Sequence, residues 1–260
     1  LYYDKAPLEE ARNVSIAGCV QSVIPGYTDF YWESRLNVAK MVELVLNDGK
    51  DPVTGTKLGP ETGVWEAFHS YEDLYQAVIK QLKYFIPLLR DISRVGWNIA
   101  RESVPVPYGS TLVNDCIEKG KDLADGGARY GGGDGISFIG VIDTANSLAA
   151  IKKLVFEEKK VTLKQLKEAL EANFEGYEEL LKMCLDAPKY GNDDEYVDSI
   201  AKDLYDICGR EHQRFPDYLG RPSVQPSAYS VTSHWALGRY TGALPSGRRA
   251  KQPLCDASVS

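Results

Sequence analysis

The sequence is poor in the residues that build disulfide frameworks and metal sites. Its 260 residues include three histidines and five cysteines, and no two cysteines form a CxxC pair. The cysteines are Cys19, Cys116, Cys184, Cys208 and Cys255. An odd number of scattered cysteines is typical of neither a disulfide framework nor a structural zinc site. We therefore expect reduced thiols and no bound metal.

Long hydrophobic runs and strongly basic segments are absent as well. No apolar run approaches the roughly 18 residues that a transmembrane helix needs, and residues 1–13 are too acidic and polar for a signal peptide. The net charge is −7, without any block rich in lysine and arginine, which argues against nucleic acids and anionic membranes as partners. These absences indicate a cytoplasmic protein that binds neither nucleic acid nor membrane.

The sequence does contain a succession of helical patterns with short strands between them. Apolar residues at spacings of three and four predict helices over 36–50, 70–89, 144–156, 162–184 and 195–213. Thr162 and Gln165 form a capping box at the start of the fourth of these helices. Runs rich in β-branched and aromatic residues predict strands over 136–143 and 227–238. This alternation is typical of an α/β protein.

A glycine-rich segment covers residues 104–135 and holds eight glycines and two prolines. It matches neither of the usual glycine patterns that bind phosphate through a loop and a helix N-terminus. We therefore interpret the segment as a set of tight connections, where backbone segments pass close to one another.

Cys19 stands in an apolar run, SIAGCVQSVIPG, that covers residues 15–26 and breaks at Pro25 and Gly26. Taken alone, a buried cysteine packs as a small apolar group. An apolar setting also disfavours the thiolate that ionic nucleophilic chemistry needs, whereas transfer of a hydrogen atom from the S–H bond involves no charge. The run is therefore compatible both with an inert cysteine and with radical chemistry.

Five segments, taken together and in this order, resemble the glycyl radical enzymes of the pyruvate formate-lyase superfamily. They are GCV (18–20) with PG (25–26), DCI (115–117) with GGARY (126–130), VID (141–143) with NSLAAI (146–151), YGND (190–193), and TGALP (241–245) with GRRA (247–250). Each segment is weak by itself, but the set spans nearly the whole chain.

The resemblance implies a fold and a role for Cys19. The family fold is an α/β barrel of ten strands with helices outside, and a cysteine loop projects into the barrel centre. Residues 1–260 would form part of a single catalytic barrel domain, beginning just before the cysteine loop and ending before the C-terminal glycyl radical domain. Cys19 would become a thiyl radical that abstracts hydrogen from a small organic substrate.

The resemblance also implies a cofactor and partners. The radical-bearing glycine lies on a C-terminal loop in the family, and its motif does not occur in these 260 residues. A radical S-adenosylmethionine activase with an iron–sulfur cluster would install that radical, so we expect no cofactor bound to this chain itself. The expected partners are this activase, a small-molecule substrate of anaerobic metabolism and a second copy in a homodimer. The 260 residues alone are expected to be inactive.

Two positions near the cysteine indicate a branch of the family. Pyruvate formate-lyase has two adjacent cysteines, whereas Gly18-Cys19 is similar to the single-cysteine branch of diol dehydratases, choline and sulfonate lyases and arylacetate decarboxylases. Many of those enzymes carry a basic glutamate two residues after the cysteine, where this chain has Gln21. An amide cannot take a proton at neutral pH. Glu33, fourteen residues after Cys19, matches an acid of the diol dehydratases.

The remaining candidate residues and functions are less sharply defined. Tyr229 and Ser233 lie in the predicted strand 227–238, which would form part of the substrate pocket wall.

The favoured function is a lyase that cleaves a C–O, C–N, C–S or C–C bond. Gln21 leaves open a radical-addition enzyme similar to alkyl- or arylsuccinate synthases, because addition to an alkene needs no base there. A non-catalytic paralogue that keeps the barrel is the third hypothesis.

Overall fold

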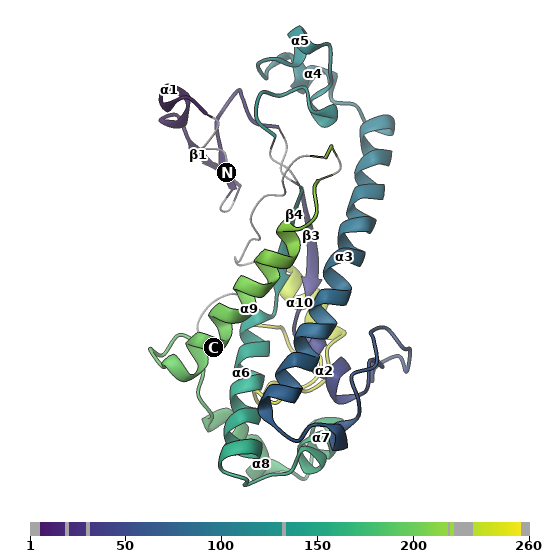
Figure 1. Ribbon diagram of the computed structural model, residues 1–260, viewed down its shortest axis with the longest axis vertical. Coiled ribbons are helices and arrows are strands. Elements are labelled where there is room, and N and C mark those ends of the chain that lie inside the picture. Colours follow the sequence, from purple (N-terminus) through teal and green to yellow (C-terminus); the bar gives the residue numbers. More distant parts are fainter. Residues whose placement is uncertain are drawn as a thin grey trace. The chain divides into compact units, whose positions relative to one another are not determined.

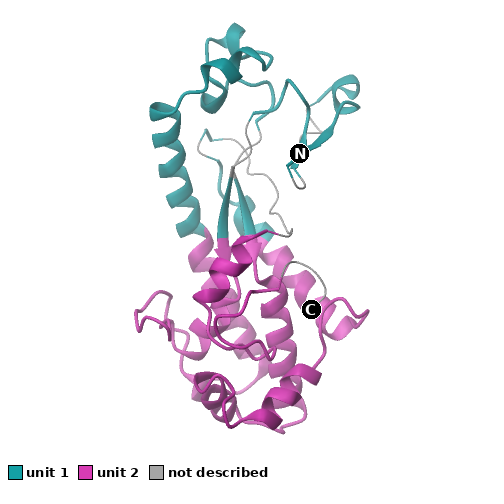
Figure 2. Ribbon diagram, turned by 180° about the vertical axis from the view of Figure 1, so that it is seen from behind, with its two compact units in different colours: residues 1–35, 87–137, 209–229 teal, residues 36–86, 138–208, 230–260 magenta. Residues whose placement is uncertain are grey.

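The computed structural model describes residues 6–18, 21–29, 32–131, 134–217, 219–220 and 231–255 (Figure 1). The chain divides into two compact units, which are coloured separately in Figure 2. The first unit comprises residues 1–35, 87–137 and 209–229, and the second comprises residues 36–86, 138–208 and 230–260. Several segments that are far apart in sequence thus meet within each unit.

Short elements make up most of the first unit. They are α1 (Leu8–Ala11), β1 (Ser15–Ala17), β2 (Gln21–Val23), α4 (Pro107–Thr111), α5 (Cys116–Lys119) and the 3-10 turn η2 (Leu123–Asp125). Asp122 caps η2 by accepting a hydrogen bond from the Ala124 N–H. Over residues 104–131, the predicted tight connections are confirmed as short helices joined by turns, and a Cβ atom at Gly127 would clash with the Lys121 carbonyl oxygen.

The second unit is mostly helical. Its elements are α2 (Lys40–Leu46), η1 (Trp65–Ala67), α6 (Val141–Ile151), the π-helical turn η3 (Lys152–Glu157), α7 (Leu163–Glu171), α8 (Glu178–Asp186) and α10 (Ser233–Arg239). Four elements contain residues of both units: β3 (Trp32–Asn37), β4 (Asp134–Ile139), α3 (Tyr71–Ser103) and α9 (Glu195–Gln213). The predicted helices over 195–213 and at 162 are confirmed, including the Thr162–Gln165 capping box.

Helix α6 forms the centre of the second unit. Every residue from Val141 to Ile151 is buried, so the helix is enclosed on all sides. Gly140 turns the chain from β4 into α6 with a φ of +80°, and a Cβ atom there would lie 2.9 Å from the Ala39 side chain. A glycine is required by both the left-handed backbone and this close approach.

The C-terminal segment folds back over the second unit and is held by Arg248. The guanidinium donates to the Gly242 carbonyl at 2.7 Å, to Gly238 at 2.8 Å and to Pro253 at 3.1 Å. It also donates to the Gln252 carbonyl. One side chain therefore donates to backbone carbonyls on both sides of the turn at residues 245–247 and ties the two sides together.

Five sequence predictions differ from the structure. The helix predicted over 36–50 forms only over Lys40–Leu46, because residues 36 and 37 end strand β3. The predicted strand 227–238 is wrong over 233–238, which belongs to helix α10, because this segment packs closely against residues 252–254. The Leu254 N–H donates to the His234 carbonyl at 3.2 Å. The helix predicted over 162–184 is broken between α7 and α8, where Asn173 and Phe174 have positive φ. Helix α6 begins at Val141, so the strand predicted to 143 ends earlier. Helix α3 continues through Pro87 to Ser103, well beyond the predicted end.

The described residues form two sheets of two strands each, β1–β2 and β3–β4. Helices and short strands are thus combined in one chain, as the sequence pattern predicts. The ten-stranded barrel that the resemblance implies stays a proposal for the complete protein.

Candidate functional site

An antiparallel hairpin flanks the cysteine of interest. Strand β1 pairs with β2 so that Ala17 faces Gln21 and Ser15 faces Val23. Residues 18–20 connect the two strands, and Cys19 itself lies outside the described residues. A short hairpin keeps the ends of its connecting loop close together, since the strand pairing fixes both ends. The described strands therefore place Ala17 and Gln21, which flank the segment containing Cys19 in the sequence, opposite each other.

Gln21 lies against the backbone at the start of this loop. Gly18 has a φ of +59°, and a Cβ atom added to it would lie 2.7 Å from the Gln21 Oε1 atom. The amide of Gln21 thus lies beside the residue that directly precedes Cys19. An amide can donate and accept hydrogen bonds, but it cannot act as a base.

Substituting Gly18 with alanine tests whether this contact matters. The left-handed backbone costs about 1–2 kcal/mol for a residue with a Cβ atom, and the Gln21 amide must also move. We expect weaker strand pairing and lower activity in the complete gene product, measured by hydrogen exchange of the hairpin and by turnover. Gly55→Ala is the matched control, because Gly55 has a φ of +71° with open space around it. Equal losses of activity in both variants would contradict the prediction.

Glu33 lies on strand β3. Its side chain is half-buried, and burial raises its pKa to about 7, against the opposing charge of Arg35. Its Oε1 atom is buried and has no hydrogen-bond partner within the described part of the chain. A carboxyl group with this pKa exchanges its proton near neutral pH, which is what a general base or acid needs.

The other predicted site residues are placed as follows. Ser233 is half-buried at the first position of α10, in the second unit. Tyr229 lies outside the described residues. Cys116, Cys184 and Cys208 are buried among apolar side chains, as the inert interpretation of these cysteines predicts.

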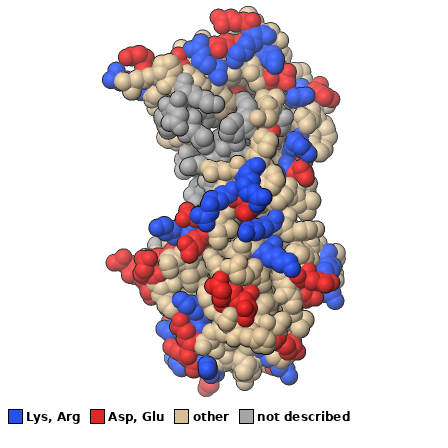
Figure 3. Space-filling model, in the orientation of Figure 1, with Lys and Arg blue, Asp and Glu red and all other residues tan. Residues whose placement is uncertain are grey.

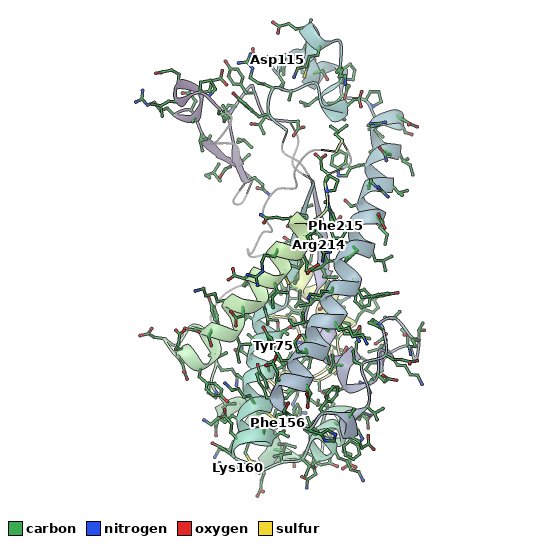
Figure 4. All side chains as sticks on the ribbon, viewed as in Figure 1. Tyr75, Asp115, Phe156, Lys160, Arg214 and Phe215 are labelled. Carbon is green, nitrogen blue, oxygen red and sulfur yellow. The ribbon has the colours of Figure 1, made fainter. Side chains whose placement is uncertain are left out.

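The cavities described in the second unit involve none of these residues. One, of about 180 Å³, lies between α2 and α7 and is lined by Glu43, Lys167 and Gly242 among others. A larger and more open one, of about 660 Å³, is lined by aromatic residues that include Trp65 and Phe156, the second of which is labelled in Figure 4. Neither cavity contains Gln21, Glu33 or Ser233 in its lining.

Sequence reasoning missed a polar cluster in the first unit. Arg129 forms an ion pair with Asp115 at 2.7 Å and another with Glu10 at 2.7 Å. Asp115 precedes α5, where Figure 4 labels it. Glu10 precedes Arg129 by 119 residues, so no local pattern could have joined them. The only signal in the sequence was that Asp115 and Arg129 both belong to segments that resemble the family.

Both signs of charge occur on the surface of the described residues (Figure 3). On the face shown in Figure 3, acidic side chains lie among basic ones. Among the described helices, none combines the length and the apolar composition needed to cross a membrane. Within the same residues, no group of three or more His, Cys, Asp or Glu side chains is arranged to hold a metal ion.

Comparison with known proteins decides the family. A family model described as pyruvate formate lyase-like matches residues 1–238. The chain belongs to this family. The match includes the cysteine hairpin, the Asp115 and Arg129 segments and the β4–α6 turn.

The family's curated members and solved structures include close matches. Trans-4-hydroxy-L-proline dehydratase of Clostridioides difficile is 39% identical over 255 residues, which are 96% of this chain and 31% of the relative. The crystal structure of that organism's hydroxyproline dehydratase with its substrate bound has a TM-score of 0.91 at 38% identity, and the match covers 97% of this chain and 32% of that one.

Two further matches differ in activity and in origin. Indoleacetate decarboxylase of Tractidigestivibacter scatoligenes is 32% identical over 286 residues, which cover 97% of this chain and 31% of the relative. A glycyl radical enzyme from Archaeoglobus fulgidus has a TM-score of 0.87 at 32% identity, covering 98% of this chain and 32% of that structure. The chain therefore spans about a third of the length of the relatives that it matches.

Proposed function

We propose that this chain is the cysteine-bearing part of a glycyl radical lyase. The observation that carries the proposal is the β1–β2 hairpin, whose connecting loop holds Cys19 in a chain that matches glycyl radical enzymes over nearly its whole length. The relatives named above are a dehydratase and a decarboxylase, so the reaction class is bond cleavage and the substrate is a small organic molecule.

The glycyl radical, carried by the complete enzyme, would supply the unpaired electron that starts each turnover. Cys19 would pass the hydrogen atom of its S–H bond to the glycyl radical carbon, which forms a C–H bond, and Cys19 would be left as a thiyl radical. The thiyl sulfur then takes a hydrogen atom from a C–H bond of the substrate, which re-forms S–H and leaves a substrate carbon radical. Each transfer moves one proton and one electron together, so it needs neither a thiolate nor a charged intermediate on sulfur.

Gln21 and Glu33 supply the polar chemistry of this proposal. Glu33 takes the proton that the substrate loses as the bond breaks, or holds a substrate hydroxyl in place. Gln21, beside Gly18, orients the substrate through its amide. Tyr229 and Ser233 contribute to the pocket wall. With one carboxylate in place of two, the site differs from a simple diol dehydratase, so the substrate must need less base catalysis near the cysteine.

The same proposal assigns the partners of the complete protein. A radical S-adenosylmethionine activase generates the glycyl radical, and two copies of the complete protein form a homodimer. The protein works in the cytoplasm under anaerobic conditions, because the radical must be kept away from oxygen.

Electron paramagnetic resonance tests the function directly. The complete gene product, treated with an activase under anaerobic conditions, is expected to give a glycyl doublet and to turn over a member of a panel of hydroxylated, sulfonated and arylacetate substrates. The 260-residue chain alone is expected to give no doublet. A complete gene product that gains no radical with any activase supports the non-catalytic paralogue instead. A radical enzyme that only adds its substrate to an alkene supports the synthase.

The protonation of Glu33 predicts the pH dependence of the reaction. With a pKa of about 7, the carboxyl is mostly protonated at pH 6 and mostly ionised at pH 8. A base must be ionised, so kcat/KM should rise with pH through about 7, and Glu33→Gln should remove this limb. Glu9→Gln, at an exposed ion pair with Arg12, is the control. If the limb persists in Glu33→Gln, another group is the base.

A further inference from the structure

The structure assigns Arg129 as the positioning residue that fixes the base of the hairpin carrying Cys19. This inference rests on the proposed function for its catalytic consequence, and on contacts within the first unit for its structural one. The contacts on which the inference rests join residues on both sides of the hairpin to the segments around it, and all of them are between described residues.

Arg129 holds the segment that leads into the hairpin. Its Nη1 atom donates to Glu10 Oε1 at 2.7 Å, and Glu10 belongs to α1, five residues before β1. Tyr130 donates its hydroxyl to the other oxygen of the same carboxylate at 2.5 Å. Both oxygens of Glu10 are therefore bound by neighbouring residues of one segment, which fixes the entry to β1.

The same arginine holds the segment that leaves the hairpin. Its guanidinium carbon lies 4.8 Å from the centre of the Tyr27 ring, in the geometry of a cation–π contact. Backbone hydrogen bonds join the same two segments. The Tyr130 N–H donates to the Tyr27 carbonyl at 2.9 Å, and the Asp29 N–H donates to the Tyr130 carbonyl at 3.1 Å. The exit from β2 is thus fixed by the residue pair that also fixes the entry.

Asp115 anchors the arginine to the rest of the unit. Its carboxylate accepts from Arg129 Nη2 at 2.7 Å and from Nε at 3.1 Å, a forked arrangement that lysine cannot reproduce. The preceding residue, Asn114, donates its N–H and its side-chain amide to the Gly26 carbonyl at 2.7 Å and 2.8 Å. The Asp115 pKa is lowered by the hydrogen bond from Arg129, so the pair is ionised at neutral pH.

The consequence is a rigid base for a loop that must place one sulfur atom. Hydrogen transfer requires the reacting atoms at close range, and a misplacement of about 1 Å can cost on the order of 10²-fold in rate. The cluster is partly exposed, with 38% of the Arg129 side chain accessible, so its ion pairs add little to global stability. Its effect is therefore expected in the position of the hairpin rather than in folding.

The test compares Arg129→Gln with a matched control in the complete gene product. Arg12→Gln removes an exposed arginine whose partner Glu9 lies 3.5 Å away, just before the same hairpin. In the unactivated protein, hydrogen exchange of residues 15–23 should accelerate at least tenfold in Arg129→Gln and stay unchanged in Arg12→Gln. After activation, kcat per glycyl radical should fall at least tenfold in Arg129→Gln, with KM changed less than twofold.

Graded variants and an independent control separate the possible outcomes. Arg129→Lys and Asp115→Asn should give intermediate losses, and they replace Arg129→Gln as the test if that variant does not fold. Wild-type hairpin exchange and wild-type kcat in these variants overturn the inference. A Cys19→Ala enzyme with full activity overturns the proposed function, while the exchange data still decide whether Arg129 holds the hairpin.

Discussion

Replacing Cys19 with alanine is expected to abolish turnover of the activated enzyme while leaving its glycyl radical in place. Alanine keeps the small apolar character of the site but has no S–H bond to pass on a hydrogen atom. The glycyl radical can then neither reach the substrate nor be consumed by it. The measurements are product formation, expected to fall below detection, and the amplitude of the glycyl doublet, expected to equal that of the wild type.

The matched control is Cys116→Ala. Cys116 is a buried cysteine of the first unit that packs against Leu123 and Ala128. Losing its sulfur costs some packing, but no hydrogen atom passes through it, so turnover per radical should stay close to that of the wild type. Loss of turnover in both variants would point to general destabilisation. Activity in Cys19→Ala would move the thiyl radical to another residue and remove the basis of the proposed function.

The elements that could be predicted from sequence are those set by local patterns. The Thr162–Gln165 capping box predicts the start of helix α7, because its two hydrogen bonds join residues only three positions apart. The core of helix α2 was predicted by its apolar run; the helix ends at Leu46, with Asn47 as its C-cap, just before Asp48 and Gly49 adopt positive φ.

The elements that were missed depend on less local effects. Nothing in the periodicity of residues 162–184 revealed the break at Asn173, whose side chain accepts from the Ala250 N–H and whose carbonyl accepts from Arg249. The β-branched and polar residues that precede α10 favour a strand, whereas residues 233–239 form a helix. In both places a distant part of the chain, or the burial of a turn, decides the conformation.

The residues of the candidate site that lie close together in the sequence could be predicted, whereas contacts between distant residues could not. Cys19, Gln21 and Glu33 are proposed as site residues because the resemblance to the family places its functional positions on them, and all three lie within one short segment. The environment of Glu33 was not, because its burial depends on how β3 is covered by residues distant in sequence. The Arg129 cluster joins residues 14 and 119 positions apart. Only the folded chain shows that these charges meet at the base of the hairpin.

Replacing Arg248 with methionine is expected to produce the largest loss of stability in the second unit. Methionine fills much of the same volume but cannot donate to the carbonyls of Gly238, Gly242 and Pro253. The charge of Arg248 also offsets part of the effect of burial on Asp143, whose pKa burial raises. Breaking a buried charge arrangement by removing one partner costs about 3–5 kcal/mol. We expect about 3 kcal/mol from denaturant unfolding, because Arg248 is only partly buried.

The pH dependence of the stability loss shows whether the interaction of Arg248 with Asp143 contributes to it, because a simple packing defect would not depend on pH. A carboxyl whose pKa is raised in the folded state binds its proton more tightly there, so stability falls as the pH rises above the unfolded pKa. Without Arg248, the pKa of Asp143 should rise further, and the Arg248→Met variant should lose more stability at pH 8 than at pH 5. Adding Asp143→Asn should remove this difference. Arg239→Met, at an exposed arginine of α10, should cost less than about 0.5 kcal/mol. A pH-independent loss in Arg248→Met would assign the whole effect to the carbonyl hydrogen bonds and exclude Asp143 from it.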